Sequence, residues 1–408
     1  KFSSIACFLS HINGYRAIVC SFGRVRKRET GFLRKKAAVR NLSVSANALP
    51  PPLGRGASGE ETRLPVIPPV HPSYTDGQGG VRMEQGMEML FALFGGLAMF
   101  LYGMDRMSRA LQRAAGDAMK RLLARLTATP LLGVLTGLAV TAVLQSSSAA
   151  TVIVIGFVSA GLLELPRAVA VIYGINIGTT MTAQLIAFDV QTLVYPVLFL
   201  GFLLDFAACR PRWQAVGEAV FSFGLLFEGI DILGRALQPL AGQTVFLEWM
   251  TRVKESPLLG ILLGLSMTMV VQSSSATIAL LQNVARQAGP DGIHSVLGLA
   301  GAVPVLLGDN IGTTVTALLA CIGQGKDAAR AALAHSCFNL SGSLLAAVLL
   351  PWFVRLVELI SPKGPELEVI SRQIANAHTA FNVCCALLWL PFLPWMVRLV
   401  CALVPEDR

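Results

Sequence analysis

Charged residues are scarce in this sequence. Only 14% of its 408 residues are Asp, Glu, Lys or Arg, whereas a soluble globular domain contains roughly 25%. Hydrophobic residues make up 54% of the chain, and the mean hydropathy is +0.62. A chain this apolar cannot cover its surface with polar groups, so the composition excludes low-complexity disorder and small disulfide scaffolds for the bulk of the chain. It predicts an all-α polytopic membrane protein.

The sequence also lacks the patterns of a metalloprotein or a nucleic-acid-binding protein. Its 8 cysteines show no metal-ligand spacing beside histidines, so we expect no cofactor. The net charge is +9, but residues 1–86 hold 13 Lys and Arg against 5 Asp and Glu. The rest of the chain carries 20 basic and 19 acidic residues. This balance gives nucleic acid no electrostatic footprint.

Composition divides the chain into four segments. Residues 1–86 form a basic, Pro/Gly-rich leader that we expect to be disordered or not native. Residues 87–255 and 256–403 are expected to be two transmembrane repeats, followed by a short tail, 404–408. The basic stretch from Arg106 to Arg125 is expected to face the cytoplasm, because loops on that side carry an excess of Lys and Arg.

Apolar runs mark the candidate membrane spans. The longer runs are Met87–Met104, Ala168–Phe188, Thr192–Ala208, Gln214–Leu237, Val296–Ile322, Ala331–Val354 and Ile374–Leu403. Two pairs of shorter runs flank the polar sequences Gln145–Ser148 and Gln272–Ser275. Because a helix needs about 20 residues to cross a bilayer, we expect each short pair to form a re-entrant hairpin with a polar tip.

The body of the chain contains an internal duplication. Residues 130–149 and 257–276 share 14 identities in 20 positions, including the whole Gln-Ser-Ser-Ser-Ala block. A second block, Asn-Ile-Gly-Thr-Thr-x-Thr-Ala, begins at Asn176 and again at Asn310. Two polar blocks that recur in the same order are typical of repeat-built secondary transporters, whose site lies between the repeats. We favour inverted repeats.

The two blocks suit ions of opposite charge. Serine hydroxyls beside the free backbone N–H groups of a helix N-terminus favour an oxyanion. The Asn and Thr oxygens of the second block are hard ligands of the kind that small cations prefer. Asp309 directly precedes Asn310, and an acid within a membrane span is a functional candidate with a cation as its natural partner. A sodium ion beside an oxyanion would offset its charge.

A third pattern repeats His and Asn four residues apart. His335 and Asn339 form one copy, and His378 and Asn382 the other, so each pair lies on one helix face. One interpretation is a polar lining or a proton-sensitive element. The other is a hydrogen-bonded pair that locks two helices together.

Together, the duplicated Gln-Ser-Ser-Ser and Asn-Ile-Gly-Thr-Thr blocks and the His-x-x-Phe-Asn pairs resemble the type II sodium/phosphate cotransporter family, particularly its bacterial members. The resemblance covers about 87–403 and implies sodium-coupled transport of inorganic phosphate across the inner cell membrane. Both tips continue with Ala, where relatives often carry a further Thr or Ser. Many bacterial relatives add a cytoplasmic regulatory domain, whereas this sequence ends at Arg408, so we expect such regulation to be absent or supplied by a separate chain.

The resemblance also implies residue roles. Phosphate would be bound by the serines of the two tips, Ser146, Ser147, Ser148, Ser273, Ser274 and Ser275. Sodium would be held by Gln272, Ser273, Asn310, Thr313 and Thr316, with Gln145, Asn176, Thr179 and Thr182 as first-half counterparts. Auxiliary candidates are Asp309, His335, Asn339, His378 and Asn382.

Two other functions compete with this one. Hydroxyls and helix dipoles bind any tetrahedral oxyanion, so the carried anion could be sulfate or arsenate instead of phosphate. A small carboxylate is a further alternative, although the absence of a repeated intramembrane Arg argues against a bidentate carboxylate clamp. An intramembrane serine hydrolase would use Ser147 or Ser274 with His335 or His378. That scheme needs one serine and one base and leaves the duplication unexplained, so we expect a transporter and not an enzyme.

Overall fold

The computed structural model describes residues 78–115, 129–188 and 191–406, and residues 87–408 form one unit. The leader up to residue 77 and part of the basic stretch, 116–128, lie outside the described residues. The described residues form helices and a single isolated β-bridge, between Ala288 and Ser295. The expectation of an all-α protein is confirmed.

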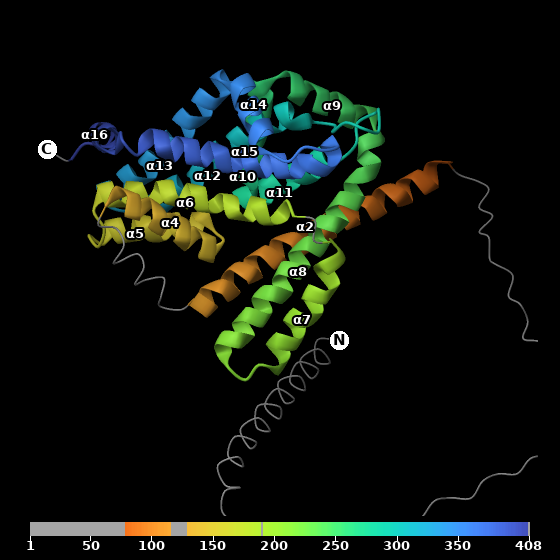
Figure 1. The fold of residues 1–408 in the computed structure, drawn as a ribbon, viewed down its shortest axis with the longest axis horizontal. Coiled ribbons are helices and arrows are strands. Elements are labelled where there is room, and N and C mark those ends of the chain that lie inside the picture. Colours follow the sequence, from red (N-terminus) through yellow and green to blue (C-terminus); the bar gives the residue numbers. More distant parts are fainter. Residues whose placement is uncertain (1–77, 116–128, 189–190, 407–408) are drawn as a thin grey trace, which may run out of the picture. The chain divides into compact units, whose positions relative to one another are not determined.

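The helices follow one another along the chain as labelled in Figure 1. They are α2 (Gln78–Ala115), α4 (Pro130–Leu144), α5 (Ser147–Ser159), α6 (Leu165–Ile186), α7 (Val194–Ala207), α8 (Pro211–Leu237), α9 (Thr244–Glu255), α10 (Pro257–Val271), α11 (Ser274–Ala285), α12 (Gly298–Ala320), α13 (Lys326–Val348), α14 (Leu350–Ile360), α15 (Glu366–Trp389) and α16 (Leu393–Leu403). Short 3-10 helices occupy Gln191–Leu193 and Gln238–Gly242.

Four helical segments of the described chain are long and apolar enough to cross a membrane, or up to six if each bent pair counts as one span. The four are Gly86–Ala114, Leu165–Ile186, Gly298–Ala320 and Lys326–Val348. The polytopic membrane fold predicted from composition is therefore confirmed. The expected spans 192–208 and 214–237 are also helical, but α7 is short and neither is among the four.

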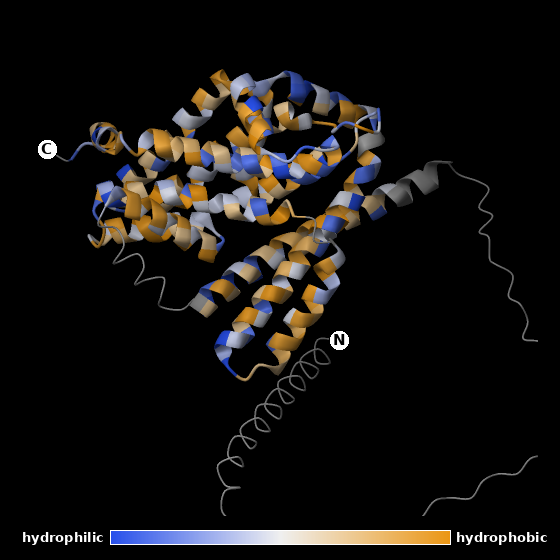
Figure 2. Cartoon of the chain, in the orientation of Figure 1, coloured by the Kyte–Doolittle hydropathy of each residue, from blue (hydrophilic) through white to orange (hydrophobic). Residues whose placement is uncertain are grey.

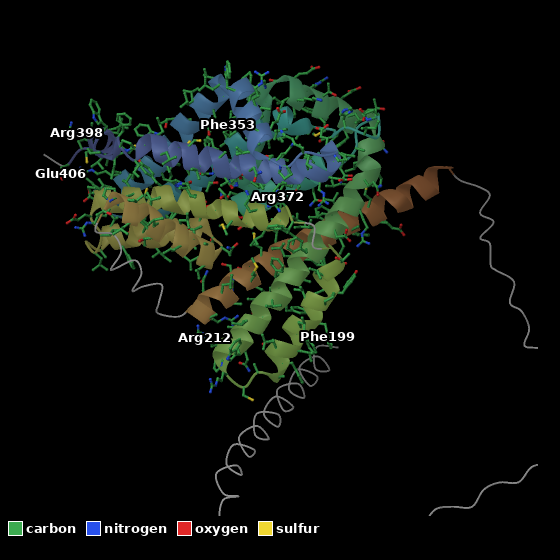
Figure 3. The ribbon with its side chains drawn as sticks, viewed as in Figure 1. Phe199, Arg212, Phe353, Arg372, Arg398 and Glu406 are labelled. Carbon is green, nitrogen blue, oxygen red and sulfur yellow. The ribbon has the colours of Figure 1, made fainter. Side chains whose placement is uncertain are left out.

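Helix α7 exposes large apolar side chains along most of its length. Its side chains Phe199, Leu200 and Phe202 are each more than half exposed, and Phe199 points away from the neighbouring helices in Figure 3. Figure 2 shows α2, α7 and α8 as largely hydrophobic, with hydrophilic residues at the turn between α7 and α8. Apolar side chains on a surface of this extent mark a contact with membrane or protein.

Two predicted spans are broken in the structure. The stretch 374–403 is divided between α15 and α16, which are bent by 85°, and 331–354 is divided between α13 and α14 at Leu349. Pro351 lies at the start of α14, just after the first break, and Pro391 lies within the second break. Proline lacks a backbone N–H and its ring clashes with the preceding turn, so it favours a kink or a break in a helix. Hydropathy alone does not reveal such a bend.

The centre of the unit is formed by α6 and α12, which carry the two Asn-Ile-Gly-Thr-Thr blocks. Each has 72% of its apolar window buried. The preceding short helices pack against them backbone to backbone: α4 on α6, and α10 on α12. A Cβ atom at Gly137 would overlap the carbonyl oxygen of Val171, and one at Gly264 would overlap that of Val305. The repeated glycines therefore set the same close approach in both halves.

The two halves are also joined by a polar contact between α6 and α15. Arg372 donates to the side-chain oxygen of Gln184 at 2.8 Å and lies over the ring of Phe188, 4.0 Å from its centroid. Figure 3 labels Arg372 in the middle of this region. Gln184 in turn donates to Asn376 and Thr379 of α15 at 3.1 and 3.0 Å. First-half and second-half helices are thus held together by side chains of α6 and α15.

Candidate functional site

Both polar tips have the same backbone geometry. Gln145 ends α4 and Gln272 ends α10, each in the left-handed region with φ of 51° and 56°. They are the two non-glycine residues with positive φ in the described chain. Non-glycine residues are uncommon in this region, and such residues cluster at ligand sites. The repeated sequence therefore encodes a repeated local turn.

The serine after each glutamine starts the next helix. The Ser146 hydroxyl accepts from the backbone N–H of Ala149 at 3.2 Å, and the Ser273 hydroxyl accepts from that of Ala276 at 3.3 Å. These are N-caps, which satisfy one of the unpaired N–H groups at the start of a helix. The first N–H groups of α5 and α11 have no partner within their helix. Each tip therefore presents backbone donors together with hydroxyls.

The two tips line one cavity. Its volume is about 200 Å³, and it is bounded by all eight residues of Gln145–Ser148 and Gln272–Ser275 together with residues of α2. Two segments 127 residues apart in sequence thus share a polar pocket. The N-termini of α5 and α11 both lie at this cavity, and a helix N-terminus carries a partial positive charge.

Helix α2 supplies the part of the cavity that sequence reasoning missed. Met104, Asp105 and Ser108 line it. The Ser108 hydroxyl donates to the backbone oxygen of Leu144 at 2.5 Å, which fixes α2 against the first tip. Asp105 is paired with Arg109 at 3.0 Å. The sequence feature that could have indicated this part of the cavity is Asp105, an acid directly after the first apolar run.

Each tip is tied to its own Asn-Ile-Gly-Thr-Thr block. Thr182 donates to Oε1 of Gln145 at 2.9 Å, and Thr316 donates to Oε1 of Gln272 at the same distance. The glutamine Nε2 groups donate to backbone oxygens at 2.6 Å in both tips. The last threonine of each block therefore lies one hydrogen bond away from the cavity.

The remaining residues of the two blocks lie deeper, inside α6 and α12. Thr179 and Thr313 donate to the backbone oxygens four residues before them at 3.0 Å. Asn176 and Asn310 are buried and donate to backbone oxygens at 2.9 Å. None of these four lines the tip cavity.

The His-Asn pairs contact the block asparagines. His335 Nε2 donates to Oδ1 of Asn176 at 3.1 Å, and Asn339 donates to the same oxygen at 3.3 Å. In the other half, Asn382 donates to Oδ1 of Asn310 at 3.3 Å. The structure thus has the helix-locking arrangement, α13 on α6 and α15 on α12. Neither pair lines the tip cavity.

The geometry that a serine hydrolase needs is missing from the described residues. His335 Nε2 is bonded to Asn176, and neither ring nitrogen of His378 has a hydrogen-bond partner. Ser147 and Ser274 make no hydrogen bond to either histidine. A nucleophile and its base must lie within hydrogen-bond reach.

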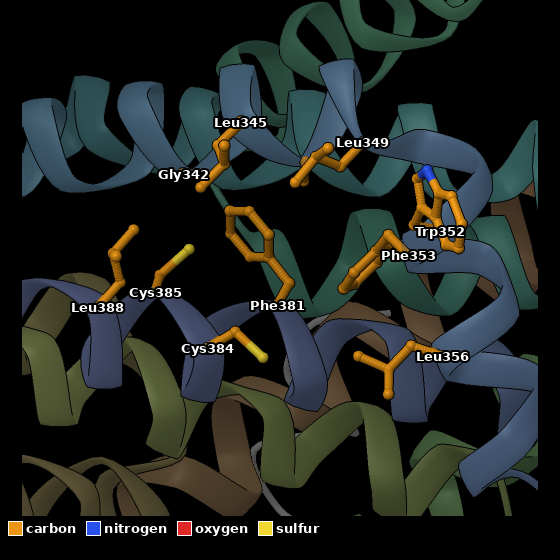
Figure 4. Close-up of a pocket in the computed structure, with 11 residues that line it drawn as sticks. Gly342, Leu345, Leu349, Trp352, Phe353, Leu356, Phe381, Cys384, Cys385 and Leu388 are labelled. Atoms are coloured by element: carbon orange, nitrogen blue, oxygen red, sulfur yellow. The ribbon is translucent and has the colours of Figure 1, made fainter.

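A second cavity, of about 350 Å³, is apolar. Figure 4 shows it between α13, α14 and α15, lined by side chains such as Leu345, Trp352 and Phe381. Because its lining offers no charged, hydroxyl or amide side chain, it does not suit a hydrated ion or an oxyanion. The polar cavity between the tips is the candidate site.

Comparisons with known proteins agree on one family. The Na+/Pi-cotransporter family model matches residues 99–235 and again 228–358. The protein YqeW of Bacillus subtilis, whose name marks it as uncharacterized, is 34% identical over 263 residues, 64% of this chain and 83% of that protein. No solved structure matches the chain.

Two groups of relatives have names that mention phosphate. The "Putative inorganic phosphate export protein YjbB" of Escherichia coli is 25% identical over 285 residues, 70% of this chain but 51% of that protein. The human "Sodium-dependent phosphate transport protein 2B" is 37% identical over 105 residues, 25% of this chain and 15% of that protein. The matched part thus spans about half the length of YjbB.

Proposed function

Because the chain belongs to the Na+/Pi-cotransporter family, we propose that it carries inorganic phosphate across a membrane with sodium as the coupling ion. The observation that carries this proposal is the single polar cavity shared by the two tips. A phosphate ion between the tips would meet serine hydroxyls and the N-termini of two helices. Both kinds of donor favour an anion where water is excluded.

Sodium is proposed to bind beside the tips. The second-half ligands are Gln272, Ser273, Asn310, Thr313 and Thr316, with Gln145, Asn176, Thr179 and Thr182 as the first-half set. A threonine hydroxyl that donates to a glutamine oxygen still has lone pairs free, and hard cations prefer such oxygen ligands. A cation here would offset the charge of the anion in the adjacent cavity, which gives the coupling a physical basis.

The carboxylate of Asp105 at the cavity favours a protonated oxyanion. Monohydrogen phosphate and arsenate carry a proton that a carboxylate can accept as a hydrogen bond, whereas sulfate has none at neutral pH. Arg109 donates to Oδ1 of Asp105, so Oδ2 is the oxygen that can accept the anion's proton. Sulfate offers that oxygen no proton, and a site that bonds a proton disfavours the analogue that lacks it. Phosphate is therefore favoured over sulfate within the class of tetrahedral anions.

The proposed membrane location and topology rest on the family and the fold. The protein is a multi-pass membrane protein, and we propose the inner cell membrane as its location, with inverted repeats and re-entrant tips. The name of YjbB mentions export, and that of the human relative mentions sodium dependence. We therefore propose that the direction of net phosphate flux follows the prevailing gradients. No cofactor beyond sodium is proposed.

Flux through proteoliposomes tests this function. Purified protein is reconstituted, and uptake of radioactive phosphate is compared with sodium or choline outside. We expect uptake only with an inward sodium gradient, and competition by arsenate but not by sulfate. Equal uptake in sodium and choline would refute the coupling, and no uptake of phosphate in either would refute the substrate.

A further inference from the structure

The second half contains an acid that the tip cavity does not use. Asp309 is completely buried in α12 and is the one Asp or Glu among the buried side chains of the described residues. Its Oδ2 atom has no hydrogen-bond partner, and no Lys or Arg of the described chain forms an ion pair with it. A charge buried without a partner is costly, so such a group is neutralised by a proton or paired with a cation.

Two threonine hydroxyls complete the surroundings of this acid. The Thr268 hydroxyl of α10 lies 2.5 Å from Asp309 Oδ1 and 3.0 Å from the Thr277 hydroxyl of α11. Both threonines are almost fully buried. Three helices thus bring oxygen atoms together at one point inside the unit. Because each hydroxyl has a single proton, lone pairs of both threonines stay available as cation ligands.

The described residues of the first half have no such cluster, although α4, α5 and α6 follow one another as α10, α11 and α12 do. The residue at the position of Asp309 is Ile175, and the residue at the position of Thr277 is Ala150. Thr141 keeps the place of Thr268, but its buried hydroxyl has no hydrogen-bond partner. Packing alone would be served equally well by an apolar residue in α12, as Ile175 demonstrates in α6.

We propose that Asp309, Thr268 and Thr277 form a monovalent-cation site for sodium that exists only in the second repeat. One carboxylate with two neutral hydroxyls balances a single positive charge, whereas a divalent ion would leave an excess charge in an apolar interior. The described residues hold no group of three or more His, Cys, Asp or Glu that could take a heavier metal. The site rests on the proposed function, because it assigns one of the coupling ions.

The site is one helical turn from the tip cavity. Thr277 donates to the backbone oxygen of Ser273 at 3.3 Å, and Ser273 lines the cavity. A sodium ion drawn to the hydroxyls of Thr268 and Thr277 would therefore hold α10 and α11 in the arrangement that forms the second tip. Sodium at Asp309 thus prepares the second tip to receive the anion, and the first tip has no equivalent of this carboxylate.

Binding of radioactive sodium to the purified protein without phosphate tests the site. Asp309→Asn keeps the shape and removes the charge, and Thr268→Val removes one ligand in case the first variant does not fold. Thr141→Val is the matched control, since it removes the equivalent hydroxyl from the half without an acid. We expect Asp309→Asn to raise the sodium concentration for half-saturation at least about tenfold, as loss of a charged contact does, and Thr141→Val to leave it unchanged.

The outcomes separate this site from the proposed function. Unchanged sodium binding in Asp309→Asn and Thr268→Val overturns the site and assigns Asp309 as a protonated hydrogen-bond partner, even if phosphate flux in the unmodified protein depends on sodium. Loss of sodium binding in Asp309→Asn supports the site, even if flux proves independent of sodium and the coupling proposal fails. Equal losses in Asp309→Asn and Thr141→Val overturn it, because a general loss of packing would explain both.

Discussion

Thr316 on α12 donates a hydrogen bond of 2.9 Å to the side-chain oxygen of Gln272, the residue that turns the chain at the second tip. Gln272 is in the left-handed region, so its side chain is aimed by a backbone conformation that few residues adopt. The hydrogen bond holds that side chain against the second Asn-Ile-Gly-Thr-Thr block. An ion that binds to Thr316 or to Gln272 would therefore affect the second tip and the second Asn-Ile-Gly-Thr-Thr block together.

Removing this hydroxyl should weaken the proposed sodium binding. We expect Thr316→Val to raise the sodium concentration for half-maximal phosphate flux about fivefold, since a neutral hydrogen bond contributes about 1 kcal/mol. The measurement is flux in proteoliposomes across a sodium series. The control is Thr251→Val on α9, an exposed threonine bonded to its own helix. An unchanged half-maximal concentration in Thr316→Val would contradict the ligand assignment.

Loss of one tip hydroxyl should weaken phosphate binding. Ser274 is buried at the cavity, so Ser274→Ala removes a donor that water cannot replace. We expect the phosphate concentration for half-maximal flux to rise about tenfold, with sodium held in excess. Ser336→Ala on α13 removes a hydroxyl bonded to its own helix away from the cavity. Similar changes in both variants would show that the tip serine has no special role.

Selection against sulfate should depend on the carboxylate of α2. Asp105→Asn replaces an acceptor with an amide that can also donate, so the variant should bind sulfate and phosphate with more similar affinity. Competition of each anion with radioactive phosphate measures this ratio. Arg109→Gln breaks the Asp105–Arg109 pair but keeps the carboxylate, and it should keep the selectivity. Sulfate exclusion that survives in Asp105→Asn would rule out this role.

The packing of α10 on α12 should not tolerate a methyl group at the crossing. A Cβ atom at Gly308 would overlap the carbonyl oxygen of Ile261, which is backbone and cannot swing away. Gly308→Ala should therefore cost about 1–3 kcal/mol by overpacking and lower the thermal unfolding temperature in detergent. Gly156→Ala on α5 has open space around its Cβ atom and should be neutral or slightly stabilising. Equal stability of the two variants would contradict the close approach.

One ion pair in the loop between α11 and α12, outside the membrane spans, should make folding stability depend on pH. His294 Nδ1 contacts the Asp291 carboxylate at 2.6 Å, and this hydrogen bond raises the pKa of His294, while backbone and side-chain hydrogen bonds from His294 lower the pKa of Asp291. The contribution of His294 to folding stability is fully present below the pKa of histidine in the unfolded chain, and it is lost as pH rises through the raised pKa of the folded protein. The contribution of Asp291 to folding stability is present above the ordinary pKa of aspartate, and it is lost as pH falls through the lowered pKa of the folded protein.

Asp291→Asn should return the pKa of His294 toward its ordinary value, which NMR titration of the labelled imidazole measures. The His294 signal is identified by its loss in a His294→Gln variant, which separates it from the signals of the other histidines. A His294 pKa that is equal in the unmodified protein and in Asp291→Asn would show that the pair does not form in solution.

The sequence alone determined the membrane character, the duplication and the two polar tips. These are recoverable because they are local: proline and a capping hydroxyl start α4 and α10, and serine caps start α5 and α11. Identical local sequences then produce identical local turns, as Gln145 and Gln272 do with nearly the same φ. The family followed from the same motifs.

The tertiary structure determined which residues these motifs contact. No sequence pattern places Asp105 and Ser108 of α2 at the cavity, and none predicts that His335 bonds Asn176 rather than a tip serine. Apolar runs could not reveal the bend between α15 and α16, because hydropathy records composition and not helix direction. Likewise, Asp309 is an isolated acid in the sequence. Only the packing of α10 and α11 on α12 surrounds it with hydroxyls and leaves one of its oxygens unpaired.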